Sequence, residues 1–207
     1  MLYLCSVIRN KSTNIVMEKK YKLTKEFITF NGRKLYRIEA IRDFCLIKKG
    51  DKGGFIETER NLSHDGTAWV RDDAKVFGGA KVCGNANIRD YAIVSNYAKV
   101  SGNAWVVDKA SVFDKAKVSG QSMISGYANV SGDANVCREE DYIVFRNWWS
   151  SYRYFTWTRS NNMWRVGCFY GTGEELIKKA YKDSEKSGRE YERIVKYVDG
   201  MLADNKK

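Results

Sequence analysis

His64 is the single histidine in a chain of 207 residues, so any chemistry that needs an imidazole must use it. A zinc site with three histidines cannot be built, and a Ser-His or Cys-His pair would depend on His64 as its general base. The sequence also contains no Walker loop, paired-carboxylate signature or Cys-x-x-Cys pair. These features favour a protein that is not an enzyme and predict no cofactor and no metal site. General-base catalysis by His64 is the alternative.

Lysine and arginine side chains supply the other candidate chemistry. The chain carries 36 basic against 25 acidic side chains, a net charge of +11, and residues 1–65 are its most basic part. A field of this sign attracts nucleic acid, nucleotides or an acidic protein surface, and the alternative is a solvated surface that only keeps the protein soluble. The candidate anion-binding residues of this region are Lys20, Lys22, Lys25, Arg33 and Lys34.

A six-residue repeat positions the remaining candidates. From Ala68 to Ala134 a small residue recurs every six positions, and a Val or Ile follows each one two residues later. This alternation predicts short strands with their apolar face inward. As far as Gly132, a Gly, Asn or Asp comes two residues after each Val or Ile, and these residue types tolerate the backbone of a tight corner.

A longer period of 18 residues sets the number of sides. The hexad Ala-Lys-Val-Cys-Gly-Asn at 80–85 returns as Ala-Lys-Val-Ser-Gly-Asn at 98–103 and as Ala-Lys-Val-Ser-Gly-Gln at 116–121. Three hexads per turn predict a triangular parallel β-helix over residues 66–138, whose twelve hexads make about four coils. Each coil buries its apolar side chains only against its neighbours, so both ends need caps.

Residues 18 positions apart stack at about 4.8 Å on one face of such a β-helix. Lys81, Lys99 and Lys117 form one column, and like charges at this spacing repel unless their stems spread into solvent or an anion bridges them. The column is therefore either a solvated ladder or a track for phosphate groups. Trp69 and Trp105 share another column, for which burial under the terminal segments or in an oligomer interface is favoured over a ligand platform.

Residues 17–65 predict a basic, β-rich cap that follows a flexible extension at 1–16. Within this cap, residues 27–30 and 33–41 predict a hairpin joined by an Asn-Gly turn. Counting back in sixes from the first hexad puts His64 in an inward aliphatic slot, with Leu62 in the small-residue slot before it and Gly66 at the corner after it. We therefore predict that His64 lies half-buried at the rim of the β-helix and acts as a capping residue.

Residues 139–207 predict an aromatic-rich α+β domain, in which a strand at 153–159 pairs with a strand at 164–170. Arginines interleaved with aromatic rings can hold phosphates and stack bases, whereas the alternative is that the rings form the core of a small domain. The residues with this choice of roles are Arg153, Arg165, Trp157 and Trp164.

Two helices are expected to end the chain. Thr172 and Glu175 form a capping-box signature that opens a helix running to about Lys186. Ser187 and Gly188 interrupt the pattern, and apolar residues at helical spacing then predict a second helix.

The hexads over about residues 62–138 resemble the left-handed β-helix of hexapeptide-repeat proteins, whose best known members are acyltransferases. The Val-x-Gly-x-Ala-x form, with the segments 48–56 and 170–181, is similar to a group of bacterial and phage-borne β-helix proteins that are often labelled transferase-like. The resemblance implies left-handed coils and a homodimer or homotrimer. Two departures weaken the acyltransferase alternative: Gly lies one position later than in those enzymes, and residues 66–138 contain neither a histidine nor an extruded loop.

These features together predict a non-enzymatic β-solenoid that engages an anionic partner, either nucleic acid, a ribonucleoprotein or a nucleotide. Five dispersed cysteines suit reduced thiols, and no run of about 18 apolar residues predicts a membrane span, so a cytoplasmic location in a bacterial host cell is expected. The resemblance to phage-borne proteins implies a host protein as a further candidate partner. It also implies a role in inhibiting host defence, in the manner of an anti-CRISPR protein. An acyltransferase using His64 and a structural assembly element are the alternatives.

Overall fold

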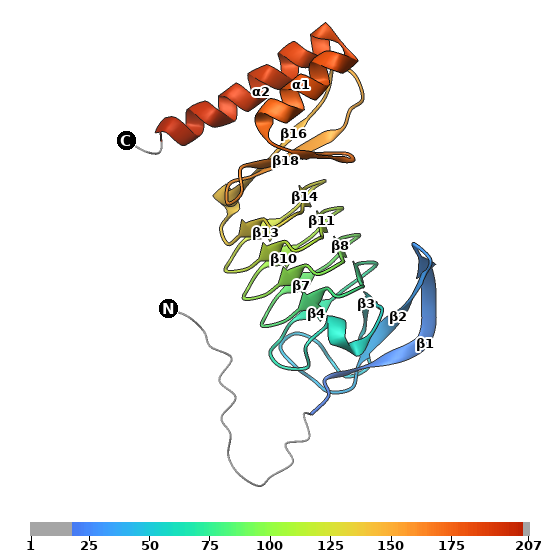
Figure 1. Ribbon diagram of the computed structural model, residues 1–207. Helices are drawn as coiled ribbons and strands as arrows, with labels where there is room; N and C mark the ends of the chain where they lie inside the picture. The colour runs from blue at the N-terminus through green and yellow to red at the C-terminus, as the bar shows by residue number, and fades with distance from the viewer. Residues whose placement is uncertain (1–17, 205–207) are drawn as a thin grey trace.

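The computed structural model describes residues 18–204, and the predicted extension at 1–16 lies outside this range. In Figure 1 the stacked coils form the middle of the molecule, a long hairpin leaves the first coil to one side, and a second sheet with two helices covers the last coil. The predicted mainly β fold, with a hairpin before the coils and an α+β domain after them, is confirmed. None of the described helices is long and apolar enough to cross a membrane.

Three parallel sheets form the sides of the coils, and each coil contributes one two-residue strand to each side. The inward Ala and Val side chains are at most 1% exposed and form one continuous hydrophobic cluster. The strands are β4 (Trp69–Val70), β5 (Lys75–Val76), β6 (Lys81–Val82), β7 (Asn87–Ile88), β8 (Ile93–Val94), β9 (Lys99–Val100), β10 (Trp105–Val106), β11 (Ser111–Val112), β12 (Lys117–Val118), β13 (Met123–Ile124), β14 (Asn129–Val130) and β15 (Asn135–Val136).

The corners between these strands use left-handed backbone, as the Gly, Asn and Asp residues predict. Asp90 has φ 58° and Gly84 has φ 69°. At Gly84 a side chain would also be crowded, because a Cβ there would lie 3.0 Å from the backbone nitrogen of Gly102 in the next coil. Glycine therefore allows the coils to stack closely at this corner.

The N-terminal hairpin continues one of the three sheets. Strands β1 (Tyr21–Phe30) and β2 (Arg33–Ala40) pair through a turn in which both residues have positive φ, Asn31 at 49° and Gly32 at 75°. Strand β2 pairs with β3 (Lys52–Ile56), and β3 lies parallel to β5 of the first regular coil. The coils therefore start before residue 66, and the stack has about five turns instead of four because β3 and Leu62 supply an additional partial turn.

Leu62 also corrects the predicted register at this end. It forms a parallel bridge with Val82, and the backbone N–H of Ser63 donates to the Val82 carbonyl at 2.9 Å. Leu62 thus fills the inward aliphatic slot that we assigned to His64. The corner from Leu62 to Gly66 is two residues longer than the corner from Val82 to Gly84, so counting in sixes fails there. His64 lies in this longer corner.

The C-terminal domain closes the other end of the stack. Strands β16 (Tyr142–Arg146), β17 (Tyr154–Thr158), β18 (Met163–Val166) and β19 (Phe169–Gly171) form an antiparallel sheet. The predicted strand at 164–170 is in fact two strands, because Gly167 at φ 58° turns the chain between β18 and β19. This sheet supplies hydrogen-bond acceptors to the last coil: Thr156 Oγ1 accepts from Asn129 N at 2.8 Å and Ser160 Oγ from Asn135 N at 2.7 Å.

Helix α1 (Gly173–Asp183) begins at the predicted capping box. Glu175 N donates to Thr172 Oγ1 at 3.2 Å, and Thr172 N donates to Glu175 Oε2 at 2.8 Å. Helix α2 (Glu185–Asp204) follows after a break at Ser184, which is earlier than the predicted break at 187–188. Gly188 lies buried inside α2 and packs against the ring of Tyr181, so it serves the close approach of the two helices.

Candidate functional site

The basic face is the surface formed by Lys81, Lys99 and Lys117. These residues lie in β6, β9 and β12, and Lys99 is in register with both of the others. All three side chains are exposed because this position of the hexad points away from the core. In the next coil toward the C-terminus, the column continues with Asn135 of β15.

The basic face has no charge partner among the residues that the structure describes. None of its three ammonium groups forms an ion pair or a hydrogen bond with any residue in the described range 18–204. Other cations do find carboxylates: Lys22 Nζ lies 2.7 Å from Glu39 Oε1, and Arg33 Nη1 lies 2.8 Å from Glu57 Oε1. The three stacked lysines therefore present their full charge to whatever lies outside the protein.

The predicted N-terminal cations have different surroundings, and Lys20 is the clearest correction. Its side chain is 0% exposed, and its Nζ donates to the Gly66 carbonyl at 3.1 Å and lies 5.3 Å from the ring centre of Phe44. Burial, with repulsion from Arg42, lowers the pKa of Lys20 to about 8. Gly66 and Phe44 lie against this buried ammonium group, so Lys20 is not a surface anion ligand. Of the remaining predicted N-terminal cations, Lys22 and Arg33 form the ion pairs given above, Lys25 is exposed, and Lys34 lies over the Phe27 ring.

The predicted aromatic set is largely internal. Trp157 is 0% and Trp164 2% exposed, and both belong to the core between the C-terminal sheet and the helices. Trp69 is also buried, in edge contact with Phe44, which precedes the coils in the chain. Only Trp105 of the four keeps a partly exposed ring, which Arg89 approaches to 5.1 Å.

Of the two C-terminal arginines, Arg153 is exposed, and the guanidinium of Arg165 lies 4.8 Å from the Phe113 ring centre. Neither residue joins the basic face, because both belong to the cap at the far end of the stack. The core alternative therefore describes the tryptophans of this domain.

His64 lies beneath β1 with a side chain that is 11% exposed. Its ring stacks on Tyr21 at 4.3 Å between centroids, and its Nδ1 accepts a hydrogen bond from Lys20 N at 3.3 Å. Its Nε2 is 3.8 Å from Glu59 Oε2, which is beyond hydrogen-bond distance. Burial lowers the pKa of His64. No serine or cysteine of the described range is hydrogen-bonded to this ring, so the arrangement suits a capping residue.

Two adjoining cavities flank the end of the basic face that lies nearest the N-terminal hairpin. The first, of about 570 Å³, lies at the first coil, and the second, of about 420 Å³, runs beside His64 and Lys99. Arg60 and Lys81 line both cavities, and Tyr97 lines the first. Sequence reasoning missed Arg60 and Tyr97. The sequence holds one weak signal for Tyr97: Gly79, 18 positions earlier in the same column, has no Cβ to displace the Tyr97 ring, but the hexad pattern alone does not single out this pair.

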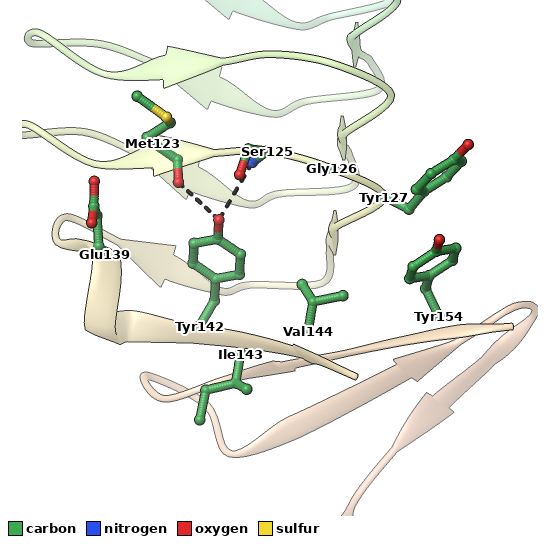
Figure 2. A pocket seen from close by; sticks show the side chains of 9 residues that line it. All are labelled: Met123, Ser125, Gly126, Tyr127, Glu139, Tyr142, Ile143, Val144 and Tyr154. Atoms are coloured by element: carbon green, nitrogen blue, oxygen red, sulfur yellow. Dashed lines mark hydrogen bonds between the residues drawn. The ribbon is translucent and has the colours of Figure 1, made fainter. Parts of the chain in front are cut away.

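Another cavity, of about 670 Å³, lies at the seam between the last coil and the C-terminal sheet. Figure 2 shows Tyr142 pointing from the sheet toward this coil, where its hydroxyl donates to the Met123 carbonyl at 2.9 Å and accepts from Ser125 N at 3.3 Å. Tyr127 of the coil and Tyr154 of the sheet stack at 4.4 Å. These side chains hold the cap on the solenoid, so the seam is a structural junction.

No protein-family model matches the chain, and no curated protein matches it significantly. Within residues 18–204, no group of three or more His, Cys, Asp or Glu side chains could hold a metal ion. The four cysteines in this range, Cys45, Cys83, Cys137 and Cys168, are unpaired. Surface geometry and charge are therefore the basis for a functional proposal.

Proposed function

We propose that this protein is a non-enzymatic β-solenoid scaffold that binds an anionic partner along the basic face. The observation that carries the proposal is the column of three exposed lysines in register on consecutive coils, with no carboxylate partner among the described residues. Bringing an anion between these ammonium groups would remove their mutual repulsion, so binding and relief of repulsion act in the same direction.

A nucleic acid strand or a ribonucleoprotein fits this column best. Two strand spacings give a span of about 10 Å from Lys81 to Lys117. A stacked strand carries one phosphate for about every 3.4 Å of its axis, so the column can meet about three successive phosphates. A rigid β-helix keeps its lysines at this spacing before the partner arrives, which reduces the ordering cost of binding.

The resemblance of the hexads supports a more specific role. If the chain is related to the phage-borne hexapeptide-repeat group, its coils would be left-handed and its partner would be a component of bacterial host defence, in the manner of an anti-CRISPR protein. The protein would then act in the cytoplasm as a homodimer or homotrimer. The acyltransferase alternative gains no support from the geometry at His64, whose Nδ1 already accepts a hydrogen bond from the backbone. The assembly alternative would use the partly exposed Trp105 and Met123 on another side, and sizing by light scattering tests it.

The test replaces Lys81, Lys99 and Lys117 with alanine and measures binding of a fluorescent single-stranded oligonucleotide by anisotropy at several salt concentrations. Each lost phosphate contact should make the slope of log K against log salt less steep by about 0.7, so the triple variant should lose about 2 in slope. Its affinity should fall at every salt concentration where the wild type binds.

A matched control removes three lysines elsewhere. Lys178, Lys179 and Lys182 are exposed on α1, at the far end of the molecule, and their replacement changes the net charge by the same amount. This control should retain nearly the wild-type slope. Equal losses in the two triple variants would mean that binding follows net charge alone, and the assignment of the basic face would then be wrong.

A further inference from the structure

We propose that the cavity at the end of the basic face nearest the N-terminal hairpin binds a nucleoside phosphate, with its base stacked on Tyr97 and its phosphate between Arg60 and Lys81. This inference rests on the proposed function, because it identifies where one nucleotide of the anionic partner is held. The residues that line this cavity of about 570 Å³ include Tyr97, Gly78, Gly79 and the two cations Arg60 and Lys81.

A short 3₁₀ turn, η1 (Glu59–Asn61), places Arg60 beside the column. The turn is fixed by Asn61, whose Nδ2 donates to the carbonyls of Gly78 at 3.0 Å and Ala80 at 2.9 Å. Its Oδ1 accepts from Thr58 N at 2.9 Å. Asn61 is buried and belongs to the fold, whereas the Arg60 guanidinium is exposed and has no ion pair or hydrogen bond with a described residue.

Tyr97 offers an aromatic surface at the same place. Its side chain is 74% exposed, and its ring lies against Gly79 of the preceding coil. A Cβ on residue 79 would be 2.7 Å from Tyr97 Cδ1, so glycine at this position leaves the ring where it is. Exposed tyrosines beside cations are the pairing that single-strand binders use, because every base has a face that stacks and every nucleotide has a phosphate.

The carboxylates near this cavity are already engaged. Glu57 accepts from Arg33 Nη1 at 2.8 Å and from Gly78 N at 2.7 Å. Glu59, on the turn, accepts from Lys19 Nζ at 2.8 Å. Their negative charge is thus offset by protein groups, and the charge that faces the cavity is the unpaired charge of Arg60 and Lys81.

The cavity is continuous with the rest of the basic face. Arg60 and Lys81 also line the second cavity, which extends to Lys99. A nucleotide seated on Tyr97 would therefore place the next phosphates of its strand along the lysine column. Lys115 follows Tyr97 in its own column, 18 residues later, and is exposed, so one further cation lies in that direction.

The same coil contains a matched control. Tyr91 occupies the equivalent slot one hexad earlier and is 58% exposed. It follows Asp90, and Asp72 and Asp108 stack on either side of that aspartate. A phosphate beside Tyr91 would meet this row of carboxylates, so exposure of a ring alone does not make a nucleotide site.

The experiment measures binding of a 5′-phosphorylated single-stranded oligonucleotide to the full chain, and of an abasic oligonucleotide of equal length that keeps the phosphates and lacks the bases. Replacing Tyr97 with alanine should weaken binding of the normal oligonucleotide about 5- to 150-fold, which is the range for one stacked base. Tyr97→Phe should retain the affinity, and Tyr91→Ala should leave it unchanged. Binding of the abasic strand should be insensitive to residue 97.

Loss of affinity in Tyr91→Ala equal to that in Tyr97→Ala would overturn the inference, as would equal effects of Tyr97→Ala on the normal and the abasic strand. In either case, the triple lysine variant would still decide the proposed function, because it can lose binding to both strands while Tyr97 proves irrelevant. A titration with a free mononucleotide separates the sources: Tyr97-dependent saturation indicates a small-molecule site, and its absence beside tight oligonucleotide binding indicates a site for a strand.

Discussion

The solenoid carries two columns of like charge on different sides, and the protein treats them differently. On the corner between the sheets of β4 and β5, Asp72, Asp90 and Asp108 repeat every 18 residues, as the lysines of the basic face do. Each of these carboxylates accepts a backbone N–H from the coil that follows: Asp72 from Asp90 N at 3.2 Å, Asp90 from Asp108 N at 3.1 Å and Asp108 from Gly126 N at 2.8 Å.

Backbone N–H groups of the protein therefore satisfy the charge of the aspartate column, whereas the lysine column has no such partner within residues 18–204. Hydrogen bonds from backbone N–H groups stabilise the charged carboxylates and offset their repulsion. Ammonium groups on the basic face make no such bond with a described residue. Stacking of like charges is therefore not by itself a sign of function. The informative feature is a stacked charge that has no partner among the described residues.

Lys20 differs from the lysines of the basic face because it is buried. Its ammonium group donates to a backbone carbonyl and has no carboxylate hydrogen-bond partner among the described residues. Its pKa is lowered from 10.5 to about 8, so between these pH values the unfolded state binds the additional proton. The free energy of unfolding should therefore rise by about 2–3 kcal/mol as pH increases from 7 toward 10. Burial raises the pKa of Tyr21, which opposes this gain above pH 10. Urea unfolding at several pH values measures the rise.

Lys20→Met should flatten this pH dependence, because it removes the titrating group and keeps most of the side-chain volume. Lys22→Met is the control, since Lys22 is exposed and paired with Glu39. If the rise with pH persists in Lys20→Met, the buried ammonium is not its source, and the contrast between exposed and buried lysines does not hold.

Asp108 tests the other side of the comparison. Asp108→Ala removes the acceptor for Gly126 N and places alanine at φ 57°, so it should lower the free energy of unfolding by about 1–2 kcal/mol. Asp108→Asn keeps an acceptor oxygen and tolerates this backbone, and should retain most of the stability. Denaturant melts of the three proteins give the ranking. An alanine variant as stable as wild type would show that the aspartate column is no more structural than the lysine column.

Most of the fold could be predicted from the inward positions of the hexads. Ala at one position and Val two residues later can pack only against the neighbouring coils. The flanks were harder, because the register changes where Leu62 replaces His64 in the core. No periodicity indicates a two-residue insertion at a corner. The burial of Lys20 was equally hidden, as it depends on contacts with Gly66 and Phe44, which are distant from it in sequence.

The candidate site was predictable only in part, for a related reason. The lysine column follows from the 18-residue period and was found. Tyr97 occupies a position of the hexad where any residue fits, so the pattern gives it no weight. Arg60 reaches the cavity because the turn at 59–61 is fastened by Asn61 to the first coil, a contact between segments that differ in repeat structure. Sites built between a repeat and its cap are therefore the ones that periodicity overlooks.

Lys99 provides the smallest expected effect and the one with the opposite sign. It has a lysine in register on each side, so Lys99→Gln, which removes the charge and keeps a long polar side chain, should leave stability unchanged or raise it by up to about 1 kcal/mol at low salt. Added salt should reduce this difference, because the repulsion is screened. Lys75→Gln is the matched control: Lys75 holds the equivalent strand position on another side, has no lysine in register, and donates to the Asp73 carbonyl at 2.8 Å, so its loss should destabilise slightly. If Lys99→Gln were as destabilising as Lys75→Gln, the lysines of the basic face would be satisfied by the fold after all, and the reason for assigning them to a partner would disappear.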